Sequence, residues 1–124
     1  MLVPILKQGD VLIASVQSDL SDHDLVQLRD NVAEKVGRFK SLGVIVDVSM
    51  LDVMDSFATR MLSTIADTTR LRGAETVIVG IQPEVAVAMV QLGLTLDGIP
   101  TALDLEEGLE LLKASIRGRG QRGN

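Results

Sequence analysis

The sequence contains no cysteine, no tryptophan and no tyrosine, and aromatic residues make up only 2% of its 124 residues. Without cysteine there is no disulfide, no thiolate metal site and no cysteine nucleophile, which fits a reducing compartment. Hydrophobic residues still make up 46% of the chain, so the core must be built from Val, Ile, Leu, Met and Ala. So much aliphatic surface on one small domain predicts an oligomer or a stable partner.

Segments for export or membrane insertion are missing too. The N-terminal MLVPILKQGD has no basic region before a long apolar run, and no apolar stretch reaches the roughly 18 residues of a membrane span. The net charge is −5, although three of the twelve basic residues lie in the final segment, RGRGQRGN. These features predict a cytoplasmic protein with an acidic body that binds neither nucleic acid nor membrane, and a disordered Gly/Arg-rich tail at 117–124.

Motifs for catalysis and metal binding are equally scarce. The single histidine, His23, lies in a polar stretch, is expected to be exposed, and has no second His or Cys to join it in a metal site. No P-loop, dinucleotide fingerprint or G-x-S-x-G elbow occurs. Asp47, Asp52 and Asp55 could hold Mg²⁺ at a sheet edge, but no phosphate-binding loop accompanies them. We therefore predict no catalytic residue, no metal and no cofactor.

Apolar periodicity predicts alternating strands and helices after an opening hairpin. GVIVDV, which begins at Gly43, is typical of a central strand buried on both faces. Ser21 is a suitable N-cap for the first helix, and Pro83 suits the first position of a later one. In chain order the expected strands are 3–8, 10–16, 43–48, 75–81 and 99–103, and the expected helices are 21–39, 56–73, 83–93 and 104–116.

The order ββαβαβαβα calls for parallel strand pairs in the middle of a sheet, with the hairpin adding an antiparallel edge. The predicted fold is therefore a single α/β domain, residues 1–116, whose mixed and mostly parallel sheet is covered by helices.

An acid and a hydroxyl, Asp55 and Ser56, stand where the central strand region gives way to a helix. Both residue types are preferred N-caps, each worth about 1 kcal/mol, so a cap is the simplest interpretation of this pair. The loop that leads to it, SMLDVM, is less ordinary because four of its six residues are apolar. Since solvated loops are normally polar, these side chains are expected to pack on the core or to face a partner.

This acid–serine pair, preceded by an apolar–Asp–apolar strand end, resembles the STAS domain of the anti-sigma-factor antagonist family. Residues 77–112 are similar to the branch of that family that builds the stressosome. Phe57-Ala58-Thr59-Arg60 follows the pair, as in the scaffold proteins of that branch, where simple antagonists have a small residue and a glycine. The resemblance covers residues 2–116 and implies that no sensory domain precedes the STAS domain.

The resemblance implies a non-enzymatic, phosphorylatable scaffold with Ser56 as the phospho-acceptor. With sensor STAS paralogues it would capture a switch serine kinase, and phosphorylation of Ser56 by that kinase would release it. The resemblance also implies a cognate phosphatase and both homo- and hetero-oligomers. Ser18 and Ser21 are not assigned as further phosphorylation sites. The expected kinase-docking residues are Asp52, Val53, Met54, Asp55, Thr59 and Arg60.

Three other interpretations compete with this one. A simple anti-sigma-factor antagonist, which binds one anti-sigma kinase, is the alternative nearest to the scaffold. A ligand-binding module would need a basic pocket or a Gly-rich cradle, and the sequence offers neither. An enzyme would need a base to activate Ser56, and none is apparent.

Overall fold

The computed structural model describes residues 3–122, except for the side chains of the last three. Its elements follow the predicted order, and each forms within a few residues of the expected bounds, apart from the end of the last helix. The strands are β1 Ile5–Gln8, β2 Val11–Ser15, β3 Gly43–Asp47, β4 Glu75–Val79 and β5 Thr101–Ala102, and the helices are α1 Asp22–Phe39, α2 Ser56–Leu71, α3 Pro83–Gln91 and α4 Leu105–Arg122.

The five strands form one sheet in the order β1-β2-β3-β4-β5. β1 and β2 are antiparallel and joined by a tight turn in which Gly9 has φ +59°. A positive φ is adopted far more readily by glycine than by other residues, so Gly9 suits the tight turn of the predicted hairpin. All remaining pairs are parallel. The prediction of a mixed, mostly parallel sheet with an antiparallel edge is confirmed.

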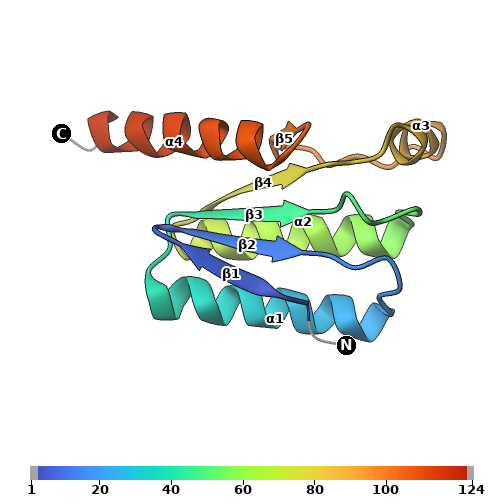
Figure 1. Ribbon diagram of the computed structural model, residues 1–124, viewed down its shortest axis with the longest axis horizontal. Helices are drawn as coiled ribbons and strands as arrows, with labels where there is room; N and C mark the ends of the chain where they lie inside the picture. The colour runs from blue at the N-terminus through green and yellow to red at the C-terminus, as the bar shows by residue number, and fades with distance from the viewer. Residues whose placement is uncertain (1–2, 123–124) are drawn as a thin grey trace.

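Alternate residues of the central strands face two separate cores. In β3, Val44 and Val46 join the larger core, whereas Ile45 faces the smaller one. Figure 1 shows α1 and α2 on one side of the sheet and α4 on the other. The larger core therefore lies under α1 and α2, and the smaller one lies between the sheet and α4, around Leu112. This two-sided burial accounts for the continuous apolar run of β3.

α4 approaches the sheet closely because glycines stand at the contact. A Cβ on Gly108 would lie 2.6 Å from Val79 Cγ1, and one on Gly43 would lie 2.9 Å from Leu112 Cδ1. Both distances are shorter than real side chains allow. Gly108 thus serves packing, although it weakens the helix locally.

α4 ends at Arg122, whereas the sequence predicted a domain end at residue 116 and a disordered tail at 117–124. Arg119 explains the difference, because its Nη1 donates to the carbonyl oxygen of Gly73 at 3.2 Å and lies 3.8 Å from Glu75 Oε1. These contacts join the end of α4 to the start of β4, which composition alone does not reveal. Residues 123–124 of the predicted tail lie outside the described residues.

The helices give the molecule two different ends. α1, α2 and α4 run opposite to the parallel strands, so their C-termini gather at the edge where the strands begin (Figure 1). The β3–α2 loop and α3 lie at the other edge, where the parallel strands end. Ligands and partners of α/β folds commonly meet this second edge. Within residues 3–122, no helix combines the length and apolarity that a bilayer crossing requires.

Candidate functional site

Asp55 is the N-cap of α2. Its backbone is extended, with φ −84° and ψ −177°, and its Oδ1 accepts the backbone N–H of Ala58 at 2.8 Å. The Thr59 hydroxyl donates to the Asp55 carbonyl oxygen, also at 2.8 Å. The capping role that the sequence offered to either member of the acid–serine pair therefore belongs to Asp55.

Ser56, the first residue of α2, is exposed. Among the described residues its hydroxyl has no hydrogen-bond partner. Backbone N–H groups of a first helical turn have no intrahelical acceptor, and the helix dipole places partial positive charge there. The Ser56 oxygen is thus free, solvent-facing and close to groups that stabilise an added anion.

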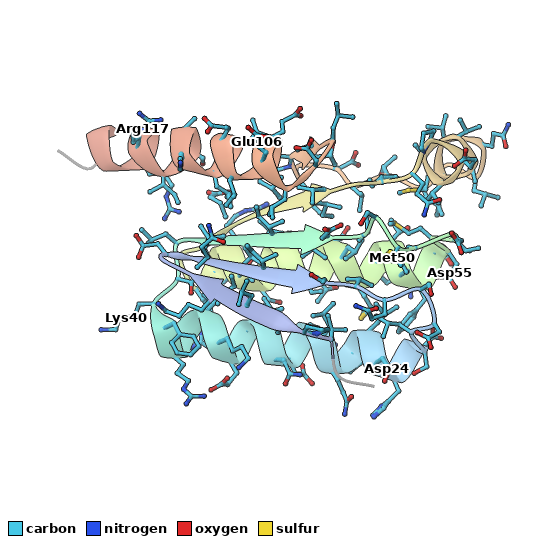
Figure 2. All side chains as sticks on the ribbon, viewed as in Figure 1. Asp24, Lys40, Met50, Asp55, Glu106 and Arg117 are labelled. Carbon is cyan, nitrogen blue, oxygen red and sulfur yellow. The ribbon has the colours of Figure 1, made fainter. Side chains whose placement is uncertain are left out.

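The apolar approach loop divides between core and solvent. Leu51 and Met54 are buried, whereas Met50 is 57% exposed and Val53 is 73% exposed. Figure 2 shows Met50 and Asp55 at the same end of the molecule. The sequence expected these apolar side chains either to pack on the core or to face a partner, and each outcome holds for part of the loop.

Four of the six predicted docking residues are on the surface, namely Asp52, Val53, Asp55 and Arg60. The other two are buried, because Met54 is 4% exposed and Thr59 is 5% exposed. Met54 precedes the N-cap and joins the larger core, while Thr59 turns its hydroxyl back to the Asp55 carbonyl. Neither side chain is exposed at the surface of the described chain.

Gln82 contributes to the site without having been predicted. Its Nε2 donates to the Ser49 carbonyl oxygen at 2.8 Å and lies 3.4 Å from Asp52 Oδ1. Gln82 occupies the N-cap position of α3 but makes no capping hydrogen bond, so its side chain is available to hold the loop. The signal in the sequence was a glutamine before Pro83, where Ser, Thr, Asp or Asn is preferred.

The two serines left unassigned differ in their surroundings. Ser21 caps α1, accepting the Asp24 N–H at 3.1 Å within a capping box. Ser18 is exposed and lines a cavity of about 170 Å³ that Val53 and Asp55 also line. The loop before α1 therefore borders the phosphorylation-site candidate.

The acidic side chains of the loop are engaged separately. Asp47 Oδ1 accepts the Ser49 N–H at 2.9 Å, Asp52 lies near Gln82, and Asp55 caps α2. Across residues 3–122 no group of three His, Cys, Asp or Glu side chains is arranged to hold a metal ion. His23 is exposed, as its polar surroundings predicted.

The fold and the site define a small α/β module that presents a free serine at the start of a helix. A family model described as the STAS domain matches residues 3–108, and the chain belongs to this family. The fold predicted from the sequence and the resemblance that supported it are therefore confirmed.

Two solved structures are similar over nearly the whole chain. RsbS of Moorella thermoacetica, in a form with a serine-to-glutamate substitution, is 35% identical with a TM-score of 0.80, covering 93% of this chain and 97% of that one. The second is a chain from a structure of the stressosome, which is described as a signal integration and transduction hub. It is 36% identical with a TM-score of 0.76, and the match covers 92% of this chain and 99% of that one. The predicted likeness to the stressosome branch, and to RsbS in particular, is confirmed.

A curated relative from Bacillus subtilis is much longer than this chain, so the match covers only part of it. The RsbT co-antagonist protein RsbRD of Bacillus subtilis is 28% identical over 107 residues, which are 86% of this chain but 38% of the relative. The chain thus spans well under half of that relative.

Proposed function

We propose that this protein is a phosphorylatable scaffold in a stressosome-type partner switch. Together with sensor STAS paralogues of the RsbR type, it holds a serine kinase of the RsbT type. Phosphorylation of Ser56 by that kinase then releases the kinase. The observation that carries the proposal is the free, exposed Ser56 hydroxyl beside a separate cap, Asp55. The likeness to RsbS supports the same role.

Ser56 suits the role of substrate and not that of catalyst. A nucleophilic serine needs a neighbouring base, and no described side chain forms a hydrogen bond with this hydroxyl. A substrate serine needs only accessibility, because the kinase supplies the catalytic groups. We therefore assign no catalytic residue, metal or cofactor to this chain, and a cognate phosphatase would reset the switch.

The surroundings of Ser56 explain how a phosphate would act. It brings a charge of about −1.5 to −2 and three acceptor oxygens, which the start of α2 accommodates without unfolding. Asp52 and Asp55 already make the neighbourhood acidic, and Val53 offers an apolar contact. A kinase fitted to Val53 and its acidic rim would meet added like charge and a doubly charged group to desolvate. Release of the kinase is the expected result.

The first test is the intact mass of the protein after incubation with ATP and its switch kinase. We expect one added phosphate on the wild type and on Ser18→Ala, the matched control at an exposed neighbouring serine, and none on Ser56→Ala. A phosphate that persists on Ser56→Ala, or none on the wild type, contradicts the assignment of Ser56.

The release step needs its own measurement. Kinase binding should weaken strongly for phosphorylated protein and for Ser56→Asp, with the circular dichroism spectrum unchanged. Equal kinase affinity for the phosphorylated and unphosphorylated forms contradicts release, even if Ser56 is the acceptor.

A further inference from the structure

A group of basic side chains surrounds one aromatic ring at the C-terminal end of α1. Lys7 Nζ, Lys35 Nζ and Arg38 Cζ lie 5.8, 5.9 and 5.3 Å from the centroid of the Phe39 ring. Phe39 is 38% exposed, and the exposed Lys40 follows it as the helix C-cap. We call these four cations and the ring the basic patch. It lies at the edge where the parallel strands begin, as Lys40 shows in Figure 2.

The basic patch carries more positive charge than its surroundings neutralise. Among the described side chains, Lys7, Lys35 and Lys40 form no ion pair, and Arg38 reaches Glu34 only at 4.0 Å. Elsewhere at the same end, Arg70 and Arg119 each pair with an acid. Like charges grouped around an apolar ring repel one another, and an anionic partner would relieve that repulsion. Because the whole chain has a net charge of −5, an excess of basic residues in the composition cannot explain this cluster of cations.

The opposite end of the molecule has the complementary charge. Asp22 and Asp55 line one cavity, Asp52 contacts the N-cap residue of α3, and Glu84 lies in the first turn of α3. All four are exposed, and none is in an ion pair among the described residues. Figure 2 shows Asp55 and Lys40 at opposite ends. We call these four carboxylates the acidic end. Exposed Met50 and Val53 lie beside it, as Phe39 lies within the basic patch.

We propose that the basic patch binds the acidic end of a second copy of this chain. The two surfaces match in charge, and each has an apolar element that the contact would bury. Because they are different surfaces on one molecule, the contact is head-to-tail and leaves a free basic patch and a free acidic end on every pair. Ser56 of the receiving copy is then covered, so self-association and the proposed kinase docking compete for the same end.

Sedimentation velocity of the full chain at two salt concentrations tests the contact. The wild type should associate at about 0.01 M salt and separate at about 1 M, because the Debye length falls from about 30 Å to about 3 Å. Lys35→Glu with Arg38→Glu should weaken association by about tenfold or more, as should Asp52→Lys with Glu84→Lys. Lys113→Glu with Arg117→Glu, two charge reversals at exposed positions of α4, is the matched control and should leave association unchanged.

Mixing the two reversed variants is the decisive step. Each carries one intact surface and one reversed surface, and the two reversed surfaces are again complementary to each other. The mixture should therefore regain the association that each variant alone has lost. Failure of the mixture to associate, or association that ignores salt, overturns the proposal. Neither result bears on Ser56, whose phosphorylation is read by mass alone.

Discussion

At the level of single residues, the start of α2 shows how two adjacent side chains divide two roles. An N-cap needs an extended backbone and an oxygen that reaches an N–H two or three residues on. Asp55 meets both conditions, which leaves the hydroxyl of Ser56, already within the helix, unused. The sequence located this pair but could not divide the roles, because Asp and Ser are both good caps and stand next to each other.

Stability measurements should separate the two residues. Asp55→Ala should lower the free energy of unfolding by about 1 kcal/mol, because the Ala58 N–H loses its acceptor. Asp55→Asn is the matched control and should retain most of that stability, since Asn also caps. Ser56→Ala should stay within about 0.5 kcal/mol of wild type in urea denaturation. A loss for Ser56→Ala as large as that for Asp55→Ala would show that the serine also supports the helix.

The docking residues show the limit of residue-level prediction. The six lie within or close to the acid–serine pair in sequence, but Met54 and Thr59 turn inward while Val53 and Arg60 turn outward. Local order does not determine this, because burial depends on where α2 packs against the sheet and α1. Gln82 was missed for the same reason: it lies thirty-three positions from Ser49 and meets it only in the folded chain.

At the level of whole elements, helices and strands follow from periodicity, while their contacts do not. Leu105, Leu109, Leu112 and Ile116 recur at helical spacing within the predicted helix 104–116, and all four pack in the smaller core. Two glycines of α4 have different surroundings, which the sequence could not distinguish. Gly108 lies where α4 touches the sheet, whereas Gly118 has no atom near its missing side chain.

The two glycines of α4 make a matched pair for a test. Gly108→Ala should destabilise the domain by about 1–2 kcal/mol, because the new methyl group would overlap Val79 and overpacking outweighs the gain in helix propensity. Gly118→Ala should instead stabilise it by up to about 1 kcal/mol, since the position is helical and open. Thermal denaturation of both variants gives the comparison. No effect at Gly118 would favour the disordered tail expected from composition.

At the level of the whole molecule, alternation of strands and helices was sufficient to predict the layers and the mixed sheet. The aliphatic composition predicted apolar surface, and exposed side chains such as Val90 at 78% and Leu103 at 82% provide it. The division of charge between two ends was not predicted. It arises because α1 ends beside the β1–β2 turn while α2 and α3 begin at the opposite edge, an arrangement visible only in the assembled fold (Figure 1).

The size of the assembly separates the scaffold from the simple antagonist. Mixed with an RsbR-type sensor paralogue, the wild-type chain should form particles far larger than a heterodimer, observed by light scattering or negative-stain microscopy. Ser56→Asp is the matched control, because it alters the exposed end proposed for kinase docking while leaving the cap and both cores unchanged. It should therefore enter the same particles but bind less kinase. If the mixture instead sediments as two separate proteins, while a single anti-sigma kinase forms a small complex with the wild type, the simple antagonist is the better description. Loss of particles with Ser56→Asp would mean that the serine end serves assembly as well as kinase capture.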